Sequence, residues 1–119
     1  MMDSIFKANL FQDKVILITG GGSGIGAGIS KSFLELGATV IIASRKKERI
    51  EKAAAGLKEL TGGNVIGMSC DIRDRDSVTE LINEIIANHQ KIDVLVNNGG
   101  GQFFSPAEYI RNKGWDSVV

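Results

Sequence analysis

Residues 15–26 read VILITGGGSGIG, and this stretch decides the fold. Its first part, Val15–Thr19, is a short apolar run rich in β-branched residues, which is typical of a strand buried on both faces. After the glycines, apolar residues recur at helical spacing at Ile25, Ile29, Phe33 and Leu36, and Gly37 then ends the helix. A glycine turn between a strand and a helix offers backbone N–H groups and a positive helix end to a pyrophosphate. The alternative is a flexible turn that binds nothing.

The remaining chain repeats this pattern of a strand followed by a helix. Apolar runs predict three further strands, at residues 39–43, 64–69 and 92–96. Asp74 is the expected N-cap of the last helix between them. The apolar stripes of the two intervening helices are Ile50, Ala54, Leu57 and Leu60 in the first, and Val78, Leu81, Ile82, Ile85 and Ile86 in the second. This alternation predicts an α/β fold with a Rossmann-like, doubly wound parallel sheet, of which the chain holds the N-terminal half in strand order 3-2-1-4.

Composition limits the classes of partner. The chain has 119 residues, with 14 lysines and arginines against 14 aspartates and glutamates. A neutral chain has no electrostatic footprint for nucleic acid or an acidic membrane, so we expect neither as a partner, and the fold requires no metal. Cys70 is the single cysteine and is expected to be buried. With no apolar stretch of membrane-spanning length, these features favour a cytoplasmic location.

The fourth strand predicts that the domain continues past the sequence in hand. Residues 92–96 are apolar on both faces, so this strand needs covering helices and a further neighbour. We therefore expect residues 1–119 to form a single Rossmann-like domain that is incomplete at its C-terminus. The longer protein is called the parent protein below, and the 119 residues alone are expected to be inactive.

Three motifs together resemble the short-chain dehydrogenase/reductase family over nearly the whole chain. The glycine turn has the spacing T-G-x-x-x-G-x-G, and Cys70-Asp71-Ile72 follows the third strand. Asn97-Asn98-Gly99-Gly100 is similar to the family's N-N-A-G element, with glycine in place of alanine. Among these residues, the resemblance implies that Asp71 accepts a hydrogen bond from the adenine amino group. The cofactor-binding residues it implies are Thr19, Gly20, Ser23, Gly24, Ile25, Gly26, Ser44, Arg45, Lys46, Asp71, Ile72, Asn97, Asn98, Gly99 and Gly100.

The end of the second strand predicts which dinucleotide binds. NAD-binding proteins place an acid there for the ribose hydroxyls, whereas this chain has Ser44-Arg45-Lys46-Lys47. The first acid is Glu48, inside the following helix, and Arg45 offers a planar fork of donors to a 2′-phosphate. The sequence therefore predicts NADP(H) as the cofactor. The alternative is a solvated basic helix start.

A Tyr-x-x-x-Lys spacing at Tyr109 and Lys113 matches the family's catalytic pair but stands in the wrong place. In the family that pair lies on a later helix after the fifth strand. Val96 occupies the position, upstream of Tyr109, where the resemblance calls for a serine. We therefore expect Tyr109 to have a packing or surface role, and no catalytic residue within this chain.

Residues 97–115, NNGGGQFFSPAEYIRNKGW, resemble the trans-2-enoyl-CoA and 2,4-dienoyl-CoA reductases within the family. This implies a parent enzyme that transfers hydride from NADPH to an α,β-unsaturated acyl thioester, a small-molecule substrate of the acyl-CoA type. Phe103 and Phe104 would form an apolar wall for the acyl chain, or they would staple the following helix to the sheet. Two other readings stay open: carbonyl or alcohol interconversion on another substrate, and a non-catalytic nucleotide-binding module. The resemblance also implies a homo-oligomer, and a peroxisomal location if the parent carries a C-terminal targeting signal.

Overall fold

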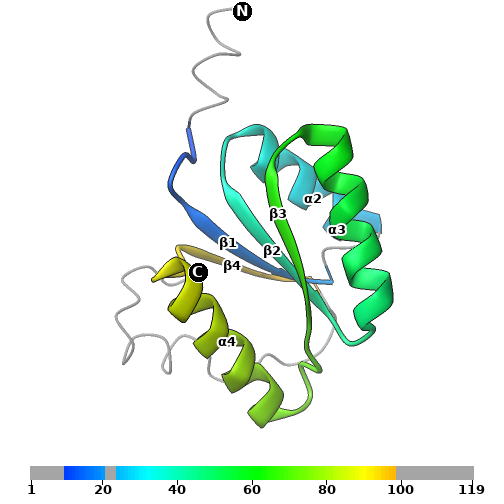
Figure 1. Ribbon diagram of the computed structural model, residues 1–119, viewed down its shortest axis with the longest axis vertical. Coiled ribbons are helices and arrows are strands. Elements are labelled where there is room, and N and C mark those ends of the chain that lie inside the picture. Colours follow the sequence, from blue (N-terminus) through cyan, green and yellow to red (C-terminus); the bar gives the residue numbers. More distant parts are fainter. Residues whose placement is uncertain (1–9, 21–23, 99–119) are drawn as a thin grey trace, which may run out of the picture.

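A computed structural model describes residues 10–20 and 24–98 and gives four strands and three helices within them (Figure 1). Their order is β1 Val15–Thr19, α2 Gly24–Glu35, β2 Thr39–Ser44, α3 Lys47–Thr61, β3 Asn64–Ser69, α4 Arg75–His89 and β4 Val94–Asn97. All strand pairs are parallel, and the sheet order β3-β2-β1-β4 confirms the predicted 3-2-1-4 arrangement. The fold is therefore the N-terminal half of a doubly wound sheet, as expected.

The helices cover both faces of the sheet, with α2 and α3 on one face and α4 on the other (Figure 1). Alternate residues of each strand point to opposite faces, so the sheet has two cores. Ile16 and Ile18 of β1 pack with Leu34 of α2. On the other face, Val15 and Leu17 pack with α4. The other buried residues that join β1 on the α2 and α3 side are Ala38, Val40, Ile42, Ile50, Ala54, Leu57 and Val65.

The α4 helix follows its sequence prediction closely. The Asp74 carboxylate caps it by accepting a hydrogen bond from the Asp76 backbone N–H at 3.0 Å. Cys70 is buried in the core beside this helix, as expected. The predicted apolar stripe is buried at Val78, Leu81, Ile82 and Ile85, with Ile86 packed partly against them.

The predicted apolar faces are wrong at two positions. Ile25 at the start of α2 is 76% exposed, and Leu60 at the end of α3 is 67% exposed. The residues of α2 that are buried against the sheet are instead Gly26, Ser30 and Leu34. The Ser30 hydroxyl donates to the Gly26 carbonyl at 2.8 Å, so its burial leaves no unsatisfied donor. Small residues on this face let the helix backbone lie close to the sheet.

The β4 strand begins later than predicted, at Val94 rather than residue 92. The Asp93 carboxylate accepts a hydrogen bond from the Val15 N–H at 2.8 Å, in place of a backbone carbonyl. The Asp93 N–H donates to the Val15 carbonyl at 2.8 Å, and Ile92 is fully buried just before it. The side chain thus holds the entry to the strand, and ladder pairing with β1 starts at Val94. The β2 strand runs one residue further than predicted, to Ser44.

Candidate functional site

The carboxyl ends of the four strands meet at one edge of the sheet. The register pairs Thr19 with Ala43 and with Asn97, and Ser44 with Ser69. This arrangement brings together most of the residues predicted from sequence, in the region where open α/β sheets bind ligands. The predicted residues Ser23, Gly99, Gly100, Phe103 and Phe104 lie outside the described part of the chain.

The glycine turn contains a position that admits no side chain. A Cβ atom at Gly26 would collide with the Gly20 carbonyl oxygen and would lie 2.6 Å from the Asn98 Nδ2 atom. Gly20 and Gly24 have φ angles of 67° and 55°, which L side chains rarely adopt. The described residues on either side of this segment, Gly20 and Gly24–Gly26, therefore lie close together at the N-terminal end of α2, where backbone N–H groups and the helix dipole favour an anion.

The ends of β1 and β4 are joined by a side-chain network behind this turn. The fully buried Thr19 hydroxyl donates to Asn97 Oδ1 at 2.9 Å and accepts from the Asn98 N–H at 3.1 Å. The Asn98 Nδ2 donates to the Gly20 carbonyl at 3.3 Å. Thr19, Asn97 and Asn98 thereby fix the position of the glycine turn relative to the fourth strand.

The basic turn after β2 presents its cations to solvent. Arg45 and Lys46 are exposed, and Lys46 is the N-cap residue of α3 but makes no capping bond with its side chain. Glu48 is also exposed and lies in the first turn of α3, as predicted. The Ser69 hydroxyl donates to the Arg45 carbonyl at 3.2 Å and ties this turn to β3. The edge therefore carries positive charge where an acid would serve ribose hydroxyls.

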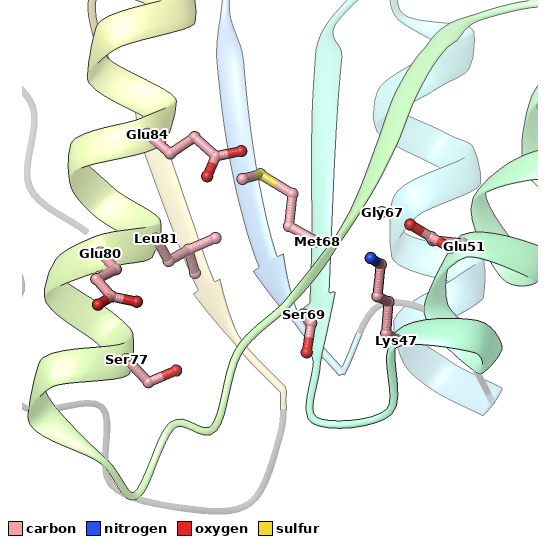
Figure 2. Close-up of a pocket in the computed structure, with 9 residues that line it drawn as sticks. All are labelled: Lys47, Glu51, Gly67, Met68, Ser69, Ser77, Glu80, Leu81 and Glu84. Atoms are coloured by element: carbon pink, nitrogen blue, oxygen red, sulfur yellow. The ribbon is translucent and has the colours of Figure 1, made fainter.

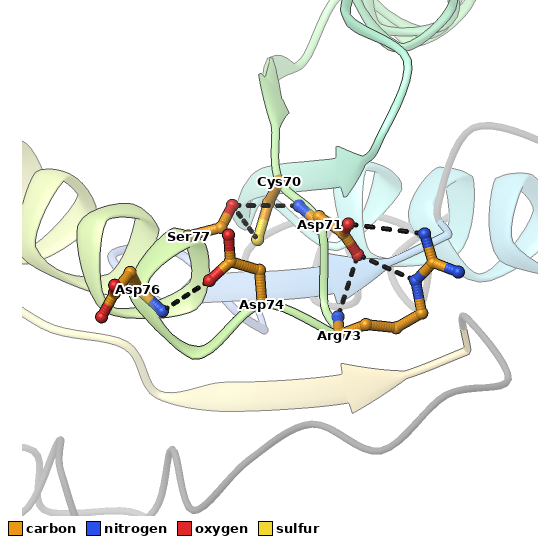
Figure 3. A network of polar contacts seen from close by, with 6 residues as sticks. All are labelled: Cys70, Asp71, Arg73, Asp74, Asp76 and Ser77. Carbon is orange, nitrogen blue, oxygen red and sulfur yellow. Dashed lines mark hydrogen bonds and ion pairs between the residues drawn. The ribbon is translucent and has the colours of Figure 1, made fainter.

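The turn after β3 holds Asp71 in a polar network (Figure 3). The Asp71 N–H donates to the Ser77 hydroxyl at 3.0 Å. The Asp71 carboxylate accepts from the Arg73 backbone N–H at 3.0 Å and from Arg73 Nε at 3.2 Å. The hydrogen bond from the Arg73 side chain, then that from its backbone, lower the pKa of Asp71, and the charges of Arg73 and Arg45 add to the effect. Asp71 is therefore an ionised acceptor at neutral pH.

The two neighbours of Asp71 face the protein interior. Burial raises the pKa of the Cys70 thiol above 9.0, and the charges of Asp71 and Asp74 act in the same direction, while the Ser77 hydrogen bond opposes them. Ile72 is half-buried against the core beneath α4. Cys70 and Ile72 thus anchor the turn, and Asp71 is the member of the motif that offers polar atoms.

Sequence reasoning missed Arg73 and Ser77. The signal for Arg73 was its position two residues after Asp71, because an aspartate often accepts a hydrogen bond from the backbone N–H two residues on. The Ser77 hydroxyl lies 3.7 Å from Cys70 Sγ and also accepts from Asp71. No sequence pattern distinguishes this serine from a surface serine in the first turn of a helix.

A pocket of about 390 Å³ lies elsewhere, at β3 between α3 and α4 (Figure 2). It is lined by Lys47, Glu51, Gly67, Met68, Ser69, Ser77, Glu80, Leu81 and Glu84. None of the predicted cofactor residues lines it. Across residues 10–20 and 24–98, no group of three or more histidine, cysteine or acidic side chains is arranged to hold a metal. No helix in the same described ranges is long and apolar enough to cross a membrane.

Comparison with known proteins assigns a relationship to most of the chain. Residues 14–119 match the family model for short chain dehydrogenases. The peroxisomal 2,4-dienoyl-CoA reductase of Arabidopsis thaliana is 36% identical over 118 residues, which are 99% of this chain and 39% of that protein. The chain therefore spans well under half the length of this curated relative.

Two solved structures show the same relationship in three dimensions. A citronellol catabolism dehydrogenase from Pseudomonas aeruginosa PAO1 is 43% identical with a TM-score of 0.73, over 80% of this chain and 39% of that one. The L-sorbose reductase of Gluconobacter frateurii, solved with NADPH and L-sorbose, is 33% identical with a TM-score of 0.72. The match covers 76% of this chain and 35% of that one. With its parallel sheet, its glycine turn and a family match across residues 14–119, the chain belongs to the short-chain dehydrogenases.

Proposed function

We propose that this chain is the cofactor-binding part of an NADPH-dependent oxidoreductase whose parent protein reduces an enoyl-CoA-type thioester. The observation that carries the cofactor assignment is the glycine turn. A Cβ atom at Gly26 would collide with the Gly20 carbonyl oxygen and would lie 2.6 Å from Asn98 Nδ2, so only glycine lets the start of α2 lie this close to the end of β1. When bound, the nicotinamide supplies the hydride, while the protein binds and orients it.

The described residues fit such a cofactor. Gly20, Gly24 and Gly26 would face the pyrophosphate with backbone only, at the positive end of α2. Ionised Asp71 would accept from the adenine amino group, beside half-buried Ile72. The remaining proposed contacts are Ile25, Ser44, Arg45, Lys46, Asn97 and Asn98, with Ser23, Gly99 and Gly100 in the undescribed segments. Thr19, also predicted from the sequence, is fully buried and would act by positioning the turn.

The preference for NADPH rests on the charge of the turn after β2. Arg45 and Lys46 are exposed there, and Glu48 is placed in the helix that follows. A guanidinium fork recognises a phosphate with two parallel hydrogen bonds, whereas it offers ribose hydroxyls no acceptor. The NADPH in the L-sorbose reductase structure supports the same choice within the family.

The substrate class rests on the curated relatives, which include peroxisomal 2,4-dienoyl-CoA reductases from a plant, a fish and a rodent. No residue of this chain is proposed as the proton donor, so the test uses the parent protein. NADPH oxidation is followed with a short 2,4-dienoyl-CoA or with crotonyl-CoA. We expect thioester-dependent loss of NADPH absorbance, and its absence would contradict the substrate assignment.

Carbonyl or alcohol interconversion is the second candidate, favoured by the names of the two solved relatives, a citronellol catabolism dehydrogenase and an L-sorbose reductase. In the same assay, a ketose or an aldehyde would then replace the thioester as the compound that consumes NADPH. If the parent protein turned over neither thioesters nor carbonyl compounds, a nucleotide-binding module without catalysis would be favoured.

We also propose that the parent protein is located in the peroxisome, as the names of the curated relatives suggest. The proposal that it is a homo-oligomer rests on the sequence resemblance alone. Imaging of the parent protein with its C-terminus free, next to a peroxisomal marker, tests the location. A diffuse signal would favour the cytoplasm instead.

A further inference from the structure

Arg73 is a third charged residue at the edge of the sheet that carries Arg45 and Asp71. Backbone and side-chain hydrogen bonds join the roots of the two turns: the Cys70 N–H donates to the Ser44 carbonyl at 2.8 Å, and the Ser69 hydroxyl donates to the Arg45 carbonyl at 3.2 Å. Asp71 therefore starts from the strand end next to that of Arg45. The charge of Arg45 adds to the lowering of the pKa of the Asp71 carboxyl, after the larger effects of Arg73.

This proximity creates an electrostatic conflict for the proposed cofactor. A 2′-phosphate carries close to two negative charges, and an unpaired carboxylate within a Debye length, about 8 Å at physiological salt, would repel it. Asp74, the next acid along the turn, faces the N-terminus of α4 and accepts from the Asp76 N–H at 3.0 Å (Figure 3). The exposed Glu48 in the first turn of α3 and Asp71 are the other carboxylates beside the basic turn, and an arginine side chain faces both oxygens of Asp71.

Arg73 offsets the charge of Asp71. Its Nε lies 3.2 Å from Asp71 Oδ1 and its Nη2 lies 3.5 Å from Oδ2, so the guanidinium faces both carboxylate oxygens (Figure 3). The backbone N–H of Arg73 also donates to Asp71 Oδ1 at 3.0 Å, which holds the carboxylate next to the guanidinium. The Arg73 side chain is 67% exposed, so it contributes little to the core.

We propose that Arg73 is a specificity-determining residue that acts through Asp71: by pairing with this carboxylate it allows a 2′-phosphate to bind at the neighbouring Ser44-Arg45-Lys46 turn. The inference rests on the proposed NADPH-binding function. It assigns Arg73 a positioning and charge-compensating role, without contact to the cofactor. The basic turn after β2 attracts the phosphate, and the Arg73–Asp71 pair removes the repulsion from the adjacent turn.

The test compares dissociation constants for NADPH and NADH, measured by titration of the purified protein, in the wild type and in Arg73→Gln. Losing the compensating charge should weaken NADPH binding about fivefold, as Coulomb repulsion across several ångströms near water predicts, and change NADH binding less than about twofold. The loss should shrink between about 0.1 M and about 1 M salt, because screening shortens the range of the repulsion. A purely structural role for Arg73 would weaken both cofactors equally at either salt concentration.

Two further variants make the test specific. Arg75→Gln removes the same charge from an exposed residue at the start of α4. It should leave the ratio of the dissociation constants for NADPH and NADH unchanged. In an Asp71→Asn background, Arg73→Gln should no longer alter that ratio, because the charge to be offset is gone. If Arg73→Gln unfolds the protein, Arg73→Lys provides the test instead: it keeps the positive charge and should therefore keep most of the preference for NADPH over NADH.

Three outcomes would overturn the inference. The ratio could be unchanged in Arg73→Gln, or it could fall equally in Arg75→Gln. It could also fall in the Asp71→Asn background, which would indicate direct contact between Arg73 and the phosphate. Failure of the wild type to bind NADPH would overturn the proposed function together with the inference, so the wild-type titration separates the two failures.

Discussion

At the scale of single residues, the site depends on glycine positions where an added Cβ atom would collide with neighbouring atoms. Gly26 and Gly28 lie one half-turn apart in α2 and differ completely in their surroundings. A Cβ at Gly26 would meet the Gly20 carbonyl and Asn98, whereas a Cβ at Gly28 has nothing within 4 Å. These two glycines separate the effect of the turn from the general cost of glycine in a helix.

Gly26→Ala should therefore lower the free energy of unfolding by roughly 1–3 kcal/mol, through overpacking, and should abolish measurable cofactor binding. Gly28→Ala should raise stability by up to about 1 kcal/mol and leave binding intact. Chemical denaturation and NADPH titration of both variants check this. Equal behaviour of the two variants would show that the turn is not closely packed.

The ionisation of Asp71 makes the stability of the fold depend on pH, and its titration can be followed at the carboxyl carbon of this residue. Because its folded-state pKa lies below the ordinary 3.8, the ionised form stabilises the fold above that pH, and this contribution disappears as the pH falls through the lowered value. An NMR titration of the Asp71 carboxyl carbon should show a midpoint below 3.8. Arg73→Gln should move the midpoint upward, and an unmoved midpoint would contradict the pairing seen in Figure 3.

At the scale of elements, sequence patterns predicted the strands better than the faces of the helices. The bounds of β1 match its apolar run, because strands buried in a parallel sheet are continuous apolar segments. The bounds of β3 were also predicted correctly, although this edge strand is only partly buried. Helical periodicity gives the spacing of apolar residues but does not show which face of a helix packs on the sheet over its first and last turns. Ile25 in the first turn of α2 and Leu60 at the end of α3 are exposed.

Side-chain pairings were the other part that the sequence did not reveal. Asp93 replaces a ladder acceptor at the start of β4, and the Arg73 side chain pairs with Asp71. The spacing of Asp71 and Arg73 indicates a backbone hydrogen bond between them, but nothing in the sequence indicates either side-chain contact. The glycine turn was recognisable because its spacing reflects a backbone requirement. Most of the candidate site was therefore predictable, and its electrostatic tuning was not.

The packing of α3 on β3 provides a prediction at this scale. A Cβ at Gly67 would lie 2.6 Å from the Ile50 carbonyl oxygen, a backbone atom of α3 that cannot move without displacing the helix. Gly67→Ala should destabilise the fold by about 1–3 kcal/mol. It should also weaken NADPH binding, since α3 begins directly after Arg45 and Lys46.

Gly56→Ala is the matched control for Gly67→Ala. Gly56 lies inside α3, and a Cβ there has nothing within 4 Å, so alanine should stabilise the helix by about 0.5–1 kcal/mol. Thermal denaturation of both variants provides the comparison. A stabilising Gly67→Ala would contradict the close approach of α3 to the strand.

At the scale of the whole molecule, the described residues form the N-terminal half of a doubly wound sheet, and open α/β sheets bind their ligands at the carboxyl ends of the strands. The chain covers 39% of the length of its Arabidopsis relative. We propose that the rest of the domain and the catalytic groups belong to the parent protein. On this account residues 1–119 supply recognition of the dinucleotide and no turnover.

The central claim is that the edge formed by the glycine turn and the Ser44-Arg45-Lys46 turn binds NADPH. Titration of the purified protein with NADPH and with NADH, in the wild type and in Arg45→Ala, tests it most directly. The wild type should bind NADPH more tightly, and Arg45→Ala should lose about 1.5–3 kcal/mol of that preference, the usual worth of a charge-assisted hydrogen bond. Tighter binding of NADH by the wild type, or no binding of either dinucleotide, would contradict the claim.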